Sequence, residues 1–238
     1  MSDNALCLAI DTSTRTASVA LARPDALLVE HTWLAGQHHT QHLLPVVQAA
    51  LTQAGVTLAD VTLLAVATGP GSFNGLRVGI ATIKSFAATL GLPIVAATSL
   101  EVAAYAHAAS PYPVCAIQDA GRRELAWAIY RGPVAAWRQV APEQITAPAD
   151  MARRLRGRTI LTGEIPDWAL PELQAAIGDR GILAAPATRV RRAGLLAELG
   201  FQRLAHGRTE DINSLQPLYL RRAPSTGGRQ STPLVMSC

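Results

Sequence analysis

Cysteine is scarce in this chain of 238 residues, and so are lysine, aromatic residues and long apolar runs. Three scattered cysteines are too few for a disulfide framework or a zinc knuckle, and they favour reduced thiols in a cytosol. No segment reaches the ~20 apolar residues of a membrane span, and the first residues lack the basic start and apolar run of a signal peptide. We therefore expect a soluble, cytoplasmic protein with no membrane contact.

Basic residues are nearly absent from the first half of the chain and abundant in the second. Residues 1–120 hold four basic and seven acidic side chains (net −3), whereas residues 121–238 hold 17 and 10 (net +7). All but one of the basic residues are arginine. Such a half could contact tRNA or an acidic partner, or it could form a solvated surface. No aromatic interleaving of the kind that stacks single-stranded bases accompanies it.

Hydrophobic periodicity predicts a two-lobed α/β fold. In the first 108 residues the expected elements are strands 5–11, 17–22, 26–33, 63–67 and 93–97 and helices 40–54, 75–90 and 99–108. Residues 109–222 repeat this theme more faintly, with strands 112–119, 124–130, 134–140, 159–162 and 182–185 and helices 148–155, 167–177 and 189–204. The repetition predicts two ribonuclease-H-like lobes with mixed sheets flanked by helices, an actin-like and sugar-kinase-like plan. Residues 223–238 are expected to be a disordered tail.

A glycine-rich loop leads from a predicted strand into a predicted helix at residues 68–79. Such a loop can hold an anion on free N–H groups at a helix start, and a plain strand-to-helix turn explains it equally well. The acid that ends the first strand suits Mg²⁺ or a water near phosphate, or an Asx-type turn. The candidate vestigial phosphate loop comprises Asp11, Thr12, Ser13, Gly69, Gly71, Ser72 and Gly75.

The helix predicted at 75–90 is too apolar for one buried stripe. Its first stripe, Leu76, Ile80, Ile83, Ala87 and Leu90, should face the sheet. Its second stripe contains two glycines four residues apart, which let another helix approach closely. Coverage by its own domain is the competing interpretation. With the helix predicted at 40–54, the candidate partner interface comprises Leu43, Val47, Leu51, Gly75, Val78, Gly79, Thr82 and Phe86.

Several motifs occur together and in order, and together they resemble the bacterial TsaB (YeaZ-type) family. They are Asp11-Thr-Ser-Thr14, His39-Thr-Gln41, Gly69-Pro-Gly-Ser-Phe73 with Gly75-Leu-Arg77, Asp119-Ala120 and Pro217-Leu-Tyr-Leu-Arg221. The resemblance covers nearly the whole chain up to Arg221, and Asn74 departs from the threonine usual in the family.

The resemblance implies a non-catalytic partner in the biosynthesis of N6-threonylcarbamoyladenosine (t6A). This modification is made at adenosine 37 of tRNAs that read codons beginning with A. The first-lobe helices are implied to bind TsaD, the catalytic paralogue, with the ATPase TsaE as a further partner and tRNA as the substrate of the complex. Without TsaD, the same surface is implied to form a homodimer.

A metal-binding histidine pair distinguishes the catalytic relatives of this family from their non-catalytic partners. The catalytic relatives carry a His-x-x-x-His pair just after the strand that follows the glycine loop and its helix, and here Ser99 and Ala103 stand in those places. We therefore expect no catalytic residue, no metal and no tightly bound cofactor, and leave ATP or ADP binding open at the level of the complex. His38 and His42, with His39 between them, also lie four apart but lack a predictable third ligand.

A second class of protein shares the two-lobed plan, the ATP-dependent kinases of the sugar and acetate type. Such an enzyme needs a catalytic acid and a phosphate loop in the second lobe. Asp119-Ala-Gly121 is the one candidate, and Arg122 and Arg123 follow it directly.

Overall fold

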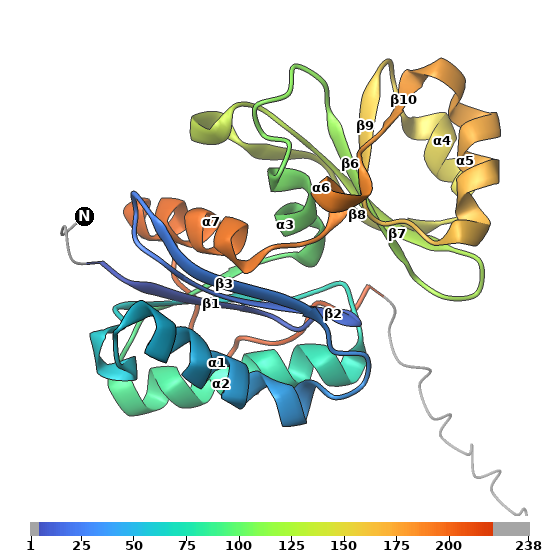
Figure 1. Ribbon diagram of the computed structural model, residues 1–238. Coiled ribbons are helices and arrows are strands. Elements are labelled where there is room, and N and C mark those ends of the chain that lie inside the picture. Colours follow the sequence, from blue (N-terminus) through green and yellow to red (C-terminus); the bar gives the residue numbers. More distant parts are fainter. Residues whose placement is uncertain (1–4, 221–238) are drawn as a thin grey trace, which may run out of the picture.

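The computed structural model describes residues 5–220, which form two lobes, each built on a five-stranded mixed sheet (Figure 1). The predicted tail at 223–238, Cys238 and the end of the motif at Arg221 lie outside the described residues. No helix within residues 5–220 is long and apolar enough to cross a membrane.

The first sheet has the strand order β3-β2-β1-β4-β5, in which β2 is antiparallel to both neighbours and β4 and β5 continue in parallel. Its strands are β1 (Cys7–Asp11), β2 (Thr16–Ala22), β3 (Leu27–Leu34), β4 (Leu63–Ala67) and β5 (Ile94–Ala97). Helices α1 (His39–Ala54) and α2 (Phe73–Leu90) cover one face, and a 3-10 turn (Leu58–Asp60) precedes β4.

The second sheet repeats this plan in the order β8-β7-β6-β9-β10, which is the same topology. Its strands are β6 (Val114–Asp119), β7 (Leu125–Arg131), β8 (Arg138–Thr146), β9 (Thr159–Glu164) and β10 (Gly181–Leu183). Helices α4 (Pro148–Arg154) and α5 (Leu170–Ile177) cover its outer face, with 3-10 turns at Val134–Ala136, Asp167–Ala169 and Gly178–Arg180. The matching topologies confirm the predicted duplicated, two-lobed fold class.

One helix from each half of the chain packs on the sheet of the other half. Helix α3 (Ser99–Tyr105) follows β5 and packs against β6 and β7, whereas α7 (Ala193–Ala205) follows the second sheet and packs against β1, β2, β4 and β5. Helices α3 and α7 therefore each make contacts across the expected boundary at residue 108. The sheet of the other half buries the apolar face of each of these two helices, and this packing holds the two lobes together.

The largest departures from the expected bounds lie in the second half of the chain. The single helix expected at 189–204 is broken into α6 (Pro186–Arg189) and α7, with Val190–Arg192 extended between them. The strand expected at 134–140 lies at Arg138–Thr146 instead. Pro133 precedes a 3-10 turn at the place where the strand was expected to begin. Pro142 lies inside β8, next to a register shift; because β8 is an edge strand, the missing N–H of Pro142 breaks no pairing between strands.

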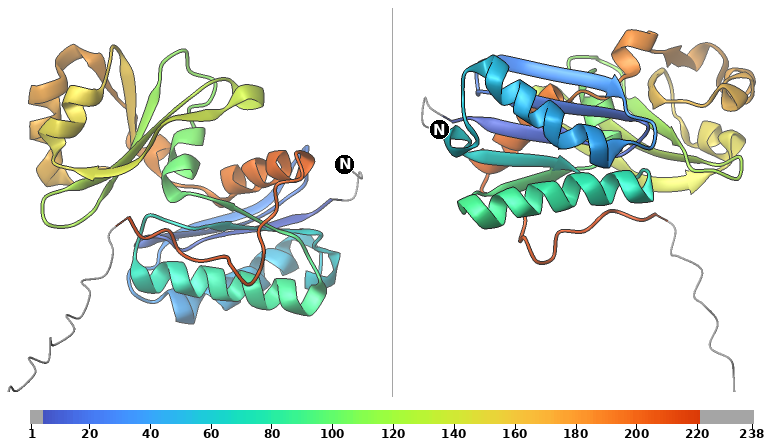
Figure 2. Two further views of the ribbon diagram at one scale, coloured as in Figure 1. Left: turned by 180° about the vertical axis from the view of Figure 1, so that it is seen from behind. Right: turned by 60° about the horizontal axis from the view of Figure 1, so that its bottom comes forward.

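The chain returns to the first lobe after α7. Residues 206–220 run beside β5 and the start of α2, as the view from behind and the tilted view both show (Figure 2). The Glu210 N–H donates to the Ile94 carbonyl over 2.8 Å, and the Leu218 N–H donates to the Thr68 carbonyl over 2.7 Å. Leu215 is buried in the core that α1 and α2 share with the sheet.

Candidate functional site

The end of β1 forms a closed hydrogen-bonded turn. One carboxylate oxygen of Asp11 accepts from the Ser13 N–H over 2.9 Å and from the Ser13 hydroxyl over 2.5 Å. Asp11, Thr12, Ser13 and Thr14 are all buried. The turn has the Asx-type geometry that was one of the two expectations for this acid.

The second carboxylate oxygen of Asp11 is taken by Arg191, whose Nε donates to it over 3.0 Å. The same guanidinium donates from Nη1 to Glu164 over 3.0 Å and from Nη2 to the Thr14 hydroxyl, which in turn donates to Glu164 over 2.6 Å. Asp11 and Thr14 belong to the first lobe and Glu164 ends β9 of the second. Arg191 is therefore a buried cation that joins the two lobes.

Burial and charge act in opposite directions on this arginine. Burial alone would lower the pKa of Arg191, but the Asp11 and Glu164 carboxylates raise it further and hold the guanidinium charged. The Arg191 side chain is 3% exposed and that of Asp11 is 1% exposed, so neither charge has water as an alternative partner. Each depends on the other for its solvation.

The glycine loop packs directly against the β1–β2 turn. A Cβ added to Gly71 would lie 2.0 Å from the Ser13 carbonyl oxygen, and one added to Gly75 would lie 2.2 Å from that of Thr12. A Cβ on Gly79 would lie 2.3 Å from the Thr12 hydroxyl oxygen. These three glycines are therefore needed for contact with a turn of the same chain.

Two backbone donors of the loop, the Ser72 and Gly75 N–H groups, bond within the chain. The Ser72 N–H donates to the Ser13 carbonyl over 2.6 Å, and the Ser72 hydroxyl caps α2 by accepting from the Gly75 N–H over 3.3 Å. The Thr12 hydroxyl donates to the Gly75 carbonyl over 2.7 Å. A vestigial phosphate role for this loop stays a prediction, and in the described structure its polar groups hold the turn.

His39 lies beneath this contact, at the first position of α1 and next to Gly75. It is 4% exposed. Burial lowers its pKa, which outweighs the opposite effects of the Thr14 backbone and the Asp11 carboxylate. A neutral imidazole at this place packs against the turn, which gives His39 of the His-Thr-Gln motif a structural role, whereas Thr40 and Gln41 are exposed.

Two hollows in the described structure bear on a possible binding site, and one of them adjoins the glycine loop. The first, about 220 Å³, brings Pro70 and Gly71 of the loop together with Gln118, Asp119 and Ala120 of the second lobe and with Leu218–Leu220. It is smaller than the ~300–1,000 Å³ of typical small-molecule pockets. The kinase-type candidate Asp119-Ala-Gly121 thus does face the glycine loop, but Asp119 accepts from the Gly121 N–H over 2.7 Å as a simple turn.

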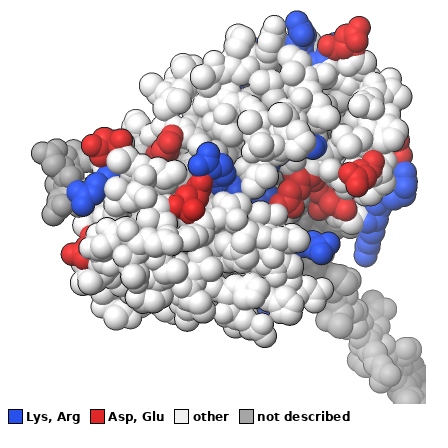
Figure 3. Space-filling view, viewed as in Figure 1, with Lys and Arg blue, Asp and Glu red and all other residues white. Residues whose placement is uncertain are grey.

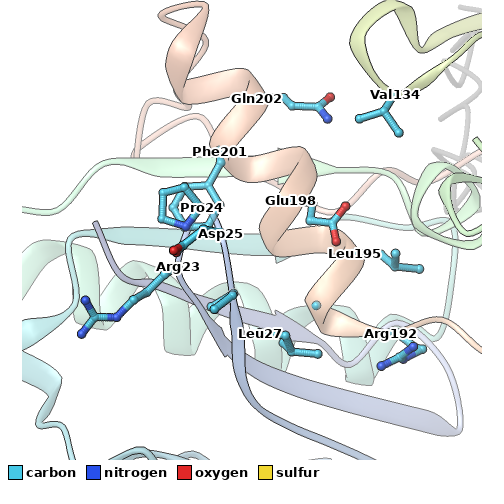
Figure 4. Close-up of a pocket in the computed structure, with 13 residues that line it drawn as sticks. Arg23, Pro24, Asp25, Leu27, Val134, Arg192, Leu195, Glu198, Phe201 and Gln202 are labelled. Atoms are coloured by element: carbon cyan, nitrogen blue, oxygen red, sulfur yellow. The ribbon is translucent and has the colours of Figure 1, made fainter. Parts of the chain in front are cut away.

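The second hollow, about 380 Å³, lies away from the predicted site residues, between the β2–β3 turn and α7 (Figure 4). Glu198, Leu195 and Gln202 line it from α7, and Val134 lines it from the second lobe. Burial raises the pKa of Glu198, against the effect of Arg192. None of the residues expected from the sequence to bind phosphate or a partner lines this hollow.

Most of the predicted partner interface is buried in the chain's own core. Leu43, Val47 and Leu51 face the first sheet, as do the expected sheet-facing residues Leu76, Ile80, Ile83 and Ala87 of α2. Gly75 and Gly79 approach the β1–β2 turn and not another helix. In the described structure these five residues are buried by contacts within the chain. Val78, Thr82 and Phe86 are half-buried at the flank of the same core.

The two positions at which the catalytic relatives carry their metal-binding histidines lie on α3 in this chain, and both are buried. Ser99 and Ala103 are 1% and 3% exposed. His38 and His42 lie on the surface with ring centroids 5.8 Å apart. Within residues 5–220, no group of three or more His, Cys, Asp or Glu side chains is placed to hold a metal ion.

Sequence reasoning missed Arg191, which is the residue that closes the site. It is one of many arginines in the second half of the chain. The helix expected at 189–204 would have made Arg191 an ordinary position of its first turn, with nothing to distinguish it from the other arginines. A faint signal did exist, because Pro186 and Gly194 bracket the position, and both weaken a continuous helix.

Comparisons with known proteins fit this architecture. The sequence signature of the family described as "TsaD: tRNA N6-adenosine threonylcarbamoyltransferase" matches residues 33–163. A protein of Bacillus subtilis (strain 168) named tRNA threonylcarbamoyladenosine biosynthesis protein TsaB is 30% identical over 219 residues, covering 91% of this chain and 94% of that protein. The protein of the same name from Escherichia coli (strain K12) is 32% identical over 221 residues, covering 90% and 94%.

Solved structures agree with the sequences. YeaZ from Pseudomonas aeruginosa matches with a TM-score of 0.78 and 27% identity, covering 91% of this chain and 100% of that one. A ROK hexokinase from Thermus thermophilus matches with a TM-score of 0.50 and 11% identity over 85% of this chain, a likeness of fold alone. Fold and site thus define a two-lobed, actin-like α/β protein whose interlobe turn is closed by its own arginine. Within that class, the chain belongs to the TsaB (YeaZ) family.

Proposed function

We propose that this chain is the non-catalytic partner subunit that supports t6A modification of adenosine 37 in tRNAs reading codons that begin with A. The observation that carries the proposal is the similarity to TsaB proteins along nearly their whole length. In this role the chain binds TsaD, works with the ATPase TsaE in the cytoplasm, and has tRNA as the substrate of the complex.

The closed interlobe turn supports the non-catalytic part of this proposal. An acid that binds a metal or activates a nucleophile needs a free oxygen aimed at the reacting group. Both oxygens of Asp11 are occupied, one by Ser13 and one by Arg191. The turn therefore supports the fold, and binding of ATP or ADP stays open at the level of the complex.

The outer faces of α1 and α2 supply the docking surface. The two helices lie side by side under the first sheet (Figure 2), and α1 has no charged residue along its 16 positions. Charged residues are depleted at the centre of protein interfaces relative to the rest of the surface, because burying an unpaired charge is costly. Figure 3 shows the same feature, since charged side chains gather along the junction of the lobes while the surface over α1 and α2 is nearly free of them.

The exposed residues of α2 define the centre of this surface. One line along the helix, at intervals of four residues, carries Phe73, Arg77, Ala81 and Ser85, all exposed. Phe73 is 51% exposed, and the Arg77 guanidinium lies 3.7 Å above its ring. On α1, Leu44 is 54% exposed. Small side chains in the middle of the line allow a partner helix to come close, and aromatic and arginine side chains at its end are the types that anchor interfaces.

Ala81→Arg tests this surface, because it places a long charged side chain at the centre of the line without touching the core. The matched control is Ala149→Arg, at an exposed alanine of α4 in the second lobe. We expect the first variant to remain folded but to lose co-purification with TsaD, and the control to retain it. Undiminished TsaD binding by Ala81→Arg would remove α2 from the interface.

Self-association is proposed to use the same surface. Two copies of a helix pair with few charged residues can pack against each other in the manner of a symmetric dimer. Ala81→Arg should then also convert an isolated dimer into a monomer in sedimentation analysis, whereas Ala149→Arg should not. A dimer that survives Ala81→Arg would place self-association elsewhere.

A further inference from the structure

A group of exposed arginines lies at one end of the strands of the second sheet, across its whole width. The functional roles proposed above do not involve these residues. We call this group the arginine edge and define it as Arg131, Arg138, Arg153, Arg156, Arg158 and Arg180. Strand register gathers these residues from five separate segments. Arg131 pairs with Arg138 across β7 and β8, and Val114 at the start of β6 faces both Tyr130 and Ile160.

The remaining members lie at the same end of the sheet. Thr159, next to Arg158, pairs with Gly181, next to Arg180. The Arg180 Nη1 donates to the Leu155 carbonyl over 2.9 Å, which ties it to the turn that carries Arg153 and Arg156. At ~4.8 Å between strands, the edge from β8 to β10 is about 19 Å long.

Positive charge at this edge is poorly compensated. Arg153 is paired with Asp150, and Asp179 is the acid next to Arg180 in the chain. Among the described residues, Arg131, Arg138 and Arg156 have no hydrogen-bonding or ionic partner for their guanidinium groups. Arg158 lies 5.3 Å above the Tyr112 ring, which orients its guanidinium without neutralising it.

We infer that the arginine edge binds the phosphate backbone of RNA, and, given the proposed function, that of the tRNA substrate. Two features favour RNA over an acidic protein: the length of the edge and its almost unbroken sign. A guanidinium presents paired donors that match phosphate oxygens. A nucleic acid backbone offers closely spaced charges of one sign along a line, which an acidic protein surface seldom does.

The position of the edge is compatible with partner binding. The starts of β6, β9 and β10 lie at the top of Figure 1, whereas α1 and α2 lie at the bottom. A protein bound to α1 and α2 therefore leaves the arginine edge open.

The test uses the complex of this chain with TsaD and TsaE, and fluorescently labelled unmodified tRNA titrated over a series of salt concentrations. The edge variant carries Arg131→Gln, Arg138→Gln and Arg156→Gln. The control carries Arg15→Gln, Arg23→Gln and Arg208→Gln, which remove the same charge from other places. If each edge arginine meets a phosphate, the slope of log Kd against log salt should fall by about 2–3 in the edge variant.

We also expect the edge variant to bind tRNA at least about tenfold more weakly near 0.1 M salt, with a raised KM for tRNA and an unchanged kcat. The control should keep the parent slope and affinity. An edge variant that assembles normally and keeps the parent slope would overturn the inference, and so would one that loses TsaD or TsaE, since the edge would then be a protein contact. If even the unsubstituted chain fails to bind TsaD, the proposed function itself fails, which is a distinguishable result.

Discussion

Replacing Arg191 by methionine should cost this protein a large part of its stability. The substitution keeps most of the side-chain volume but removes the cation that Asp11 and Glu164 share. Asp11 would then be a buried carboxylate, 1% exposed, with Ser13 as its remaining donor. Glu164 can recover water, because its side chain is already 37% exposed.

Breaking a buried ion pair from one side typically costs ~3–5 kcal/mol, against the 5–15 kcal/mol that holds an ordinary domain folded. For a chain of this size, each kcal/mol lowers the melting temperature by roughly 2–4 °C, so we expect a fall of about 6–20 °C. Urea and thermal unfolding followed by circular dichroism measure both quantities. Adding Asp11→Asn to Arg191→Met should restore much of the loss, because no unpaired charge then remains buried.

An ion pair that is exposed on both sides provides the control. Arg153 pairs with Asp150 on α4, and the two side chains are 71% and 46% exposed. Exposed pairs contribute ~0–1 kcal/mol, so Arg153→Met should change the melting temperature little. If Arg191→Met is no more destabilising than Arg153→Met, the assignment of Arg191 as the cation that joins the lobes is incorrect.

Three further outcomes follow from the same geometry. Gly79→Ala should destabilise the fold by about 1–3 kcal/mol in urea titration, because its Cβ would lie 2.3 Å from the Thr12 hydroxyl, although alanine normally favours a helix; a stabilised variant would contradict this contact. Burial lowers the pKa of His39 and of His107, so the unfolded chain binds more protons; stability should fall as pH drops below ~6.5, and less steeply in His39→Asn. Burial raises the pKa of Cys7 and Cys115, so alkylation mapped by mass spectrometry should leave both unmodified until denaturant is added.

Local pattern was sufficient for the first lobe. Strand β4 has the predicted bounds, Leu63–Ala67, and α2 begins two residues earlier than expected because Ser72 caps it. Alternation and helical period indicate which residues must be buried. The predicted stripe of α2 is buried from Leu76 to Ala87, whereas Leu90, its last predicted member, is half-buried. The order of elements along the chain and the duplicated plan followed from these signals.

What the sequence concealed were contacts between distant segments. The glycines of α2 were correctly interpreted as places of close approach, but the approaching group is the Thr12 turn and not a partner helix. Spacing shows that a small residue is needed and says nothing about what lies opposite. The pairing of Asp11 with Arg191, 180 positions later, and the exchange of α3 and α7 between the sheets likewise leave no local pattern.

The central claim is that this chain acts only with a catalytic partner. It is tested most directly by measuring t6A in unmodified tRNA after reaction with TsaD, TsaE and the threonylcarbamoyl donor, with this chain present, omitted or alone. We predict t6A in the full mixture, a strong loss when this chain is omitted, and none from this chain alone. Product formed by the chain alone, or a yield unchanged by its omission, would contradict the account.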